Sequence, residues 1–360
     1  MASGSSSERR PMARRLSPRL KAGVAWGVGG VLALACGAPT TDLPPSPSVP
    51  PATAAVLRET APTTVSPAGL LSQRLPDVSE NRLMEDVVAL SAIATRHVHS
   101  PGLGEAAAYI GGRFAEAGVA HREHTFALEL RGVRTRPANI VAVLPGSDPA
   151  AGAIVLGAHY DSRTVDIGDW TGPAPGANDN ATGVAVLLEV ARALAGFEPR
   201  ATIYLIAFAA EETGLQGSRS LVAESLLDPV VAMAAFDIVG NSSGSSGSGA
   251  LRVFAAGPEG SPSRRLARWT ANVAARWVPE LPVLVQDALD RPGRYSDHVP
   301  FTEAGIAAVR FIEDGEHVEY QHNALDTADR IDPDYLRRVA QLALAMAVEL
   351  GIEPHAFDLE

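Results

Sequence analysis

Two adjacent acidic residues, Glu211 and Glu212, follow an apolar segment, residues 203–208, that is typical of a buried strand. Two carboxylates at the mouth of a buried strand repel each other, and removing them from water costs free energy. A metal ion would compensate, with one carboxylate as a ligand and the other free to carry a proton. Paired glutamates are also common on protein surfaces. The pair therefore indicates a metal site only together with further candidate ligands.

Two candidate ligands end predicted strands. His159 follows the apolar segment 154–158, and Asp237 follows the apolar segment 231–236. Open α/β sheets place their sites beyond the carboxyl ends of strands, so both positions suit a ligand. Asp161 could hold the imidazole of His159 through its second nitrogen, a common arrangement around metal-bound histidines. A histidine at a strand end can also have a purely structural role.

Two further candidates are expected in loops. Asp179 lies in the Gly-rich segment 176–183, whose glycines allow tight backbone geometry beside a ligand. His322 lies in a polar segment near the C-terminus. Asn180 or Thr182 could cap the helix that follows Asp179, and capping is compatible with metal binding because different residues do each job.

Five side chains with nitrogen or oxygen ligands and no thiolate suit zinc. They are His159, Asp179, Glu212, Asp237 and His322. This set exceeds what one open catalytic zinc requires. One carboxylate bridging two metals would use all five ligands and leave a water site between the ions.

Predicted strands and helices alternate from about residue 77. Strands are expected at 138–144, 153–158, 201–209, 231–239, 251–255 and 306–312, the first two as neighbours, and helices at 81–94, 104–117, 182–194, 215–226, 263–277 and 333–350. Continuous apolar strands between helices imply a central sheet that is covered on both faces. We therefore predict a three-layer α/β/α fold with a mixed, largely parallel sheet.

The N-terminal part of the chain is typical of an export signal. A basic stretch is followed by the apolar segment 22–35, which is short for a membrane span, and then by a motif resembling a bacterial lipobox at Cys36. We predict a lipoprotein-type signal peptide (1–36), a Pro/Thr/Ser-rich linker (37–76) and a catalytic domain (77–360). The protein is expected to be exported, either held by lipid on Cys36 or free in the periplasm or outside the cell. A plain secretory signal or a membrane anchor is the alternative.

Composition favours a soluble enzyme over a nucleic-acid-binding protein. Of the 360 residues, 46% are hydrophobic, and the formal net charge is -11. Aromatic residues make up only 5%, and no basic stripe accompanies them, which argues against a nucleic-acid partner. The single cysteine excludes an intramolecular disulfide.

Six segments, in this order, resemble the co-catalytic zinc aminopeptidases, the family that includes the secreted bacterial leucine-type aminopeptidases. The segments are 157–162, 176–183, 210–218, 236–240, 296–301 and 322–327. The resemblance extends from about residue 81 to the C-terminus, and six ordered blocks make it specific. It implies a zinc-exopeptidase-like fold, which the glutaminyl cyclases share.

The resemblance also implies roles for the candidate ligands. His159 and Asp237 would bind one zinc ion, Glu212 and His322 would bind a second, and Asp179 would bridge the two. In this family the peptide bond after the bridging aspartate is often cis.

Further residues take roles from the same resemblance. Glu211 would be the general base, and acidic neighbours should raise its pKa. Asp297 and His298 would order the loop near the metals, or Ser296 and Asp297 could cap a helix. The family often uses a tyrosine as oxyanion donor, but Gln321 occupies one usual position, which leaves Tyr295 and Tyr320 as candidates outside the usual register.

The expected activity is removal of N-terminal residues from peptides that have a free N-terminus. A glutaminyl-cyclase-like aminoacyltransferase is one alternative, although the Glu211–Glu212 block follows the peptidase pattern. A non-catalytic binding domain is another, although such domains typically lose ligands or the base. Action on another amide, such as a dipeptide or an N-blocked substrate, is a further alternative.

Overall fold

The computed structural model describes residues 66–241, 243, 248–288 and 295–359, all of which belong to one structural unit, Pro62–Glu360. The predicted signal peptide and most of the predicted linker lie outside these residues. Within the described ranges, no helix is both long enough and apolar enough to cross a membrane.

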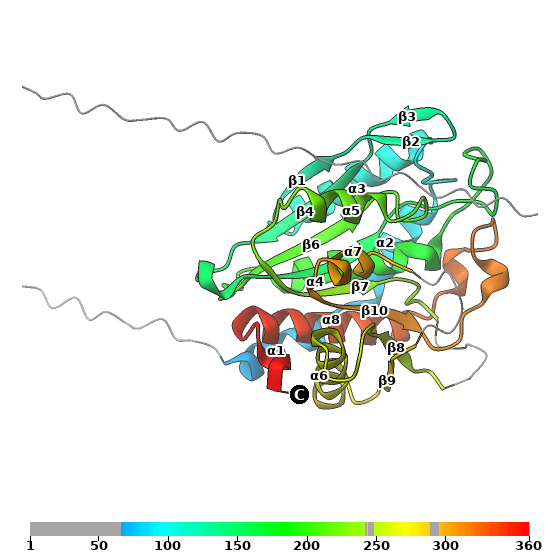
Figure 1. Ribbon diagram of the computed structural model, residues 1–360. Helices are drawn as coiled ribbons and strands as arrows, with labels where there is room; N and C mark the ends of the chain where they lie inside the picture. Colours follow the sequence, from blue (N-terminus) through cyan, green and yellow to red (C-terminus); the bar gives the residue numbers. More distant parts are fainter. Residues whose placement is uncertain (1–65, 242, 244–247, 289–294, 360) are drawn as a thin grey trace, which may run out of the picture. The chain divides into compact units, whose positions relative to one another are not determined.

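Eight strands form a mixed central sheet in the order β1-β4-β6-β5-β7-β10-β8-β9 (Figure 1). Their bounds are β1 (Ala120–Thr125), β4 (Ala138–Leu144), β5 (Ala153–His159), β6 (Thr202–Phe208), β7 (Val230–Phe236), β8 (Leu251–Phe254), β9 (Val283–Gln286) and β10 (Ala307–Glu313). The central strands β6, β5, β7 and β10 are parallel, whereas β1, β4 and β8 pair antiparallel to their inner neighbours. A separate hairpin consists of β2 (Leu128–Leu130) and β3 (Val133–Thr135). The predicted α/β fold with a mixed sheet is confirmed.

Helices cover both faces of this sheet. They are α1 (Pro67–Arg74), α2 (Glu80–Ser91), α3 (Pro101–Glu116), α4 (Thr182–Ala193), α5 (Gln216–Ala223), α6 (Pro262–Trp277), α7 (His298–Glu303) and α8 (Pro333–Ile352). Helices α4 and α8 pack on one face of the sheet, while α5 and α7 lie over the other. Two clusters of buried apolar side chains lie on opposite faces of the sheet. In β5, Ile154 and Leu156 belong to one cluster and Val155 belongs to the other, because successive side chains of a strand point to opposite faces.

Four of the helices begin with the same local sequence. In α1, α3, α6 and α8, a Ser or Asp side chain accepts a hydrogen bond from a backbone N–H in the first turn, and proline comes next in the chain. The capping residues are Ser66, Ser100, Ser261 and Asp332. Both features stabilise a helix start, so the sequence determines these boundaries locally.

The expectation that the strands at 138–144 and 153–158 are neighbours is wrong. Strand β6 lies between them, since Ile203 pairs antiparallel with Leu144 and parallel with Ile154. Helix α4 links β5 to β6 as a crossover, which returns the chain parallel to β5. Hydrophobic runs identify buried strands, but their order depends on the connection.

The predicted domain start at residue 77 is too late. Helix α1 lies inside the predicted linker, and its Leu71 is fully buried in the main core. The side chain of Gln341, in α8, donates a hydrogen bond to the backbone oxygen of Leu75 at 2.9 Å. The Ser-Pro pair at 66–67 resembles linker sequence but starts a helix, and Leu70 and Leu71 of that helix pack on the core.

We expect Leu71→Ala to lower the free energy of unfolding by about 2–5 kcal/mol, because it removes a buried aliphatic side chain and leaves a cavity. Urea unfolding of the full chain would measure the change. Val88→Ala is a matched control, since Val88 is 52% exposed on α2 and the change should stay within about 0.5 kcal/mol. Equal stability of the two variants would show that Leu71 contributes nothing to the stability of the core.

Candidate active site

The five candidate ligands gather at one edge of the sheet. His159 is the last residue of β5, Asp237 directly follows β7, and Glu212 lies shortly after β6. Because β6, β5 and β7 are neighbouring parallel strands, their carboxyl ends meet at this edge. Asp179 lies in the turn before α4, and His322 lies in the segment between β10 and α8.

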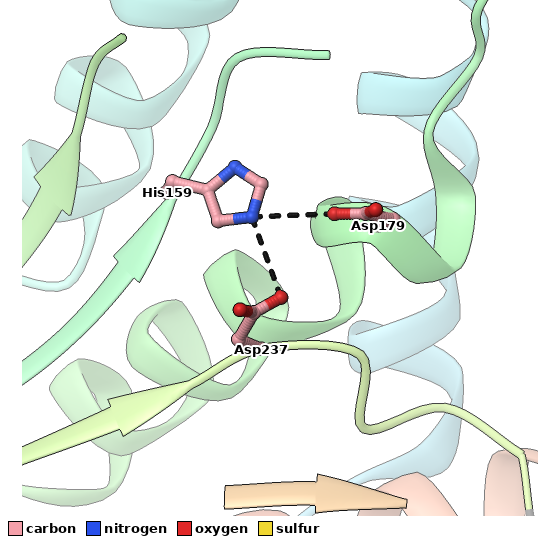
Figure 2. Close-up of side chains that lie close together, drawn as sticks. All are labelled: His159, Asp179 and Asp237. Atoms are coloured by element: carbon pink, nitrogen blue, oxygen red, sulfur yellow. Dashed lines mark ion pairs between the residues drawn. The ribbon is translucent and has the colours of Figure 1, made fainter. Parts of the chain in front are cut away.

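The first group consists of His159, Asp179 and Asp237 (Figure 2). The imidazole Nε2 of His159 lies 3.2 Å from Asp179 Oδ1 and 3.4 Å from Asp237 Oδ1. All three side chains are buried. Figure 2 shows the two carboxylates converging on one ring nitrogen from two different elements.

The second group consists of Asp179, Glu212 and His322. His322 Nε2 lies 3.2 Å from Asp179 Oδ2 and 3.2 Å from Glu212 Oε1. Asp179 therefore presents one carboxylate oxygen to each group. This is the geometry that a bridging carboxylate between two metals would need.

The chemistry of both groups fits a bound cation. Burial lowers the pKa of His322, but the carboxylates of Asp179 and Glu212 outweigh it and raise this pKa to about 10. The negative charge that raises this pKa would also attract a metal cation, which would displace the proton. Glu212 Oε1 is buried and accepts no hydrogen bond from the described part of the chain, which leaves it available as a ligand.

Asp326 fixes the position of Asp179. Its two carboxylate oxygens accept hydrogen bonds from the backbone N–H groups of Asn178 and Asp179, at 2.8 and 2.9 Å. The Asp179–Asn180 peptide bond is cis, as the family resemblance led us to expect. Gly176 has φ +57°, and a Cβ there would lie 2.5 Å from the backbone oxygen of Asp179, so the turn requires glycine.

The side chain of Asn180 connects this turn to the first turn of α4. Its side-chain oxygen accepts a hydrogen bond from the backbone N–H of Gly183 at 3.1 Å, and its Nδ2 donates to the Phe236 oxygen at 2.8 Å. The Thr182 hydroxyl instead donates to the Asn178 backbone oxygen at 2.9 Å. The turn is thus tied both to α4 and to the end of β7, which carries Asp237.

Asp161 connects His159 to the glutamate pair. The His159 Nδ1 atom lies 3.2 Å from the backbone oxygen of Asp161 and 3.6 Å from its Oδ1. The closer contact is therefore with the backbone and not with the carboxylate. The carboxylate accepts hydrogen bonds from the backbone N–H groups of Glu211 and Glu212, at 3.1 and 3.2 Å.

Glu211 lines the same cavity as the candidate ligands. Its partial burial raises the pKa of its carboxyl well above the ordinary value. The charge of His159 opposes this, whereas those of Asp237, Glu212 and Asp297 raise the pKa further. The direction agrees with the sequence-based expectation, and the structure adds burial as the main cause.

Asp297 and His298 lie at the start of α7, and both are buried. The pKa of Asp297 is raised to about 7, mainly by burial. Burial, with the charge of Arg310, lowers the pKa of His298 to about 3, so this imidazole is neutral. The side chain of Asp297 does not cap α7, and the hydroxyl of Ser296 makes no hydrogen bond within the described residues, so the capping alternative is wrong.

The two tyrosine candidates occupy different places. Tyr295 is 54% exposed and lines the cavity that contains the candidate ligands. Tyr320 lines a separate, smaller cavity, where the guanidinium of Arg330 lies 3.8 Å from the centre of its ring. The structure therefore brings Tyr295, and not Tyr320, to the candidate site.

The cavity has a volume of about 580 Å³. Besides the candidate ligands and Glu211, its lining includes the apolar side chains of Leu215, Ile238 and Val299. It also includes the side chains of Arg163, Arg219 and Arg310, which sequence reasoning missed. A charged residue inside the apolar segment 306–312 was the only available signal for Arg310.

Sequence comparison identifies relatives of this chain. The profile of peptidase family M28 matches residues 139–347. A probable zinc metalloprotease of Leptosphaeria maculans is 38% identical over 251 residues, which cover 61% of this chain and 58% of that protein. The chain spans little more than half the length of several such fungal relatives, between 52% and 58%.

Solved structures share the fold. The LapA aminopeptidase of Legionella pneumophila superimposes with a TM-score of 0.65 and 24% identity, over 80% of this chain and 76% of that one. A glutaminyl cyclase of Porphyromonas gingivalis gives a TM-score of 0.62 and 20% identity, over 75% of this chain and 98% of that one. At these identities the likeness concerns the fold alone, whereas the profile match covers more than half of the chain. The chain therefore belongs to peptidase family M28.

Proposed function

We propose that this protein is a zinc-dependent aminopeptidase that hydrolyses the first peptide bond of peptides with a free N-terminus. The main support is the pair of ligand groups that share Asp179, with Glu211 beside them in one cavity. Family membership and zinc metalloprotease relatives support zinc as the metal. We assign His159 and Asp237 to one ion, and Glu212 and His322 to a second.

The residues around the groups have distinct tasks. Bound zinc would polarise the scissile carbonyl and lower the pKa of a water molecule. Glu211, with its raised pKa, would hold a proton taken from the attacking water and pass it to the leaving amine. The acidic lining attracts the α-amino group of the substrate, and Tyr295 is the better-placed candidate to donate a hydrogen bond to the carbonyl oxygen.

Cleavage should depend on both the metal and the free N-terminus. We expect the full chain to release the first residue of a peptide, to lose this activity with a chelator and to regain it with zinc. The N-acetylated form of the same peptide should stay intact. Cleavage of both forms would indicate an amidase or an endopeptidase. Ammonia release from a peptide that begins with glutamine would favour the glutaminyl-cyclase alternative, and no reaction at all would favour a binding domain.

The role of Glu211 can be separated from metal binding. Glu211→Gln should lower kcat by about 10²- to 10⁴-fold, the usual contribution of a positioned base, while the zinc content measured by atomic absorption stays unchanged. Glu123→Gln is a matched control, because Glu123 is exposed on β1 and should leave both values unchanged. Full activity in the Glu211 variant would rule out its role as the base.

We also propose that the protein is exported and that Cys36 carries a lipid. The support is the basic stretch and the apolar segment 22–35 that precede this cysteine. Cells that produce the full chain should incorporate radiolabelled palmitate into it, and Cys36→Ser should abolish the label. Label that persists in the variant would exclude lipidation at this residue.

A further inference from the structure

Three arginines line the cavity, and each pairs with a carboxylate. Arg163 Nε lies 2.8 Å from Glu212 Oε2, and Arg310 Nη2 lies 3.0 Å from Asp237 Oδ2. In both pairs the acidic partner is a proposed metal ligand. The third arginine, Arg219, pairs at 2.7 Å with Glu303, which belongs to neither ligand group.

The oxygens of Glu212 are divided between two partners. Its Oε1 faces His322 Nε2 at 3.2 Å, while its Oε2 accepts a hydrogen bond from Arg163 at 2.8 Å. Arg163 is itself held, because its Nη1 donates to the backbone oxygen of Thr164 at 3.1 Å. One oxygen of Glu212 is therefore left for a metal, and the other is occupied.

Asp237 shows the same division in the other group. Its Oδ1 lies 3.4 Å from His159 Nε2, and its Oδ2 lies 3.0 Å from Arg310 Nη2. Arg310 comes from β10, the parallel neighbour of β7, where it pairs in register with Ala235. The sheet itself therefore brings this guanidinium to the carboxylate that follows β7.

The pairs Arg163–Glu212 and Arg310–Asp237 are more buried than the pair Arg219–Glu303. The side chains of Arg310 and Asp237 are each 5% exposed, and those of Arg163 and Glu212 are 20% and 7% exposed. Arg219 and Glu303 are 44% and 56% exposed. An exposed pair is screened by water and holds its partners weakly, whereas a buried guanidinium must keep its carboxylate as a partner.

We propose that Arg163 and Arg310 are positioning residues that occupy one oxygen of Glu212 and of Asp237 and thereby reserve the other oxygen for a metal. This inference rests on the ligand assignment of the proposed function. Each arginine also places a positive charge near the metal, which by itself weakens cation binding. The gain in affinity from holding the carboxylate ligand in a fixed orientation outweighs this repulsion. Residues that hold a metal ligand in this way typically improve metal affinity or activity 10- to 100-fold.

The test is the zinc dissociation constant of the full chain, measured by competition with a chromogenic chelator in the absence of substrate. Arg163→Gln and Arg310→Gln should each weaken zinc binding by about 10- to 100-fold. Arg163→Lys should restore only part of the affinity, since lysine keeps the charge but lacks the planar fork of donors. Arg219→Gln is the matched control and should leave zinc affinity unchanged.

Each outcome decides between distinct explanations. Unchanged affinity in the Arg163 and Arg310 variants overturns the proposal, and tighter binding overturns it in favour of a charge-balancing role. If Arg310→Gln fails to fold, as thermal unfolding of the metal-free protein would reveal, the more exposed Arg163 carries the test alone. Absence of zinc binding in the unmodified chain would refute the ligand assignment, and with it the proposed function and this inference. Normal zinc binding without peptide cleavage would refute the proposed activity only.

Discussion

The arrangement of this site depends on the repulsion between carboxylates that the sheet collects at one buried edge. Asp179, Glu212 and Asp237 lie within reach of two imidazoles, and Glu211 lines the same cavity. Such a cluster cannot remain ionised in a poorly solvated place without compensating positive charge. The imidazoles, the arginines and a bound metal can each supply that charge, and the surrounding hydrogen bonds fix which oxygen meets which partner.

Local sequence patterns were sufficient to predict most of the strands and the residues at their carboxyl ends. A strand that ends in His159 or precedes Asp237 brings its ligand to a common edge, because parallel strands share an orientation. The pattern could not reveal that β6 lies between β4 and β5, which depends on the crossover through α4. Likewise, the burial of Leu71 depends on packing in a core assembled from distant segments, so α1 resembled a linker.

The arginines were missed for a related reason. Arg163 directly follows the segment 157–162, which resembles the family, and Arg310 is a charged residue in an apolar strand. Neither position indicates which carboxylate the arginine will contact. The pairing of Arg163 with Glu212 joins residues 49 apart in the chain, and that of Arg310 with Asp237 joins β10 to the residue that follows its neighbour β7. Interactions of this kind follow from the assembled sheet and not from any local pattern.

The fold alone leaves the reaction open, since aminopeptidases and glutaminyl cyclases both superimpose on this chain. The side chains are more informative. A site for a single zinc ion would need no second group of ligands around Glu212 and His322. Here Glu212 is held through its backbone by Asp161 and through its side chain by Arg163. A glutamate that is held at both its backbone and its side chain, beside the shared Asp179, is consistent with the proposed assignment of two metal ions.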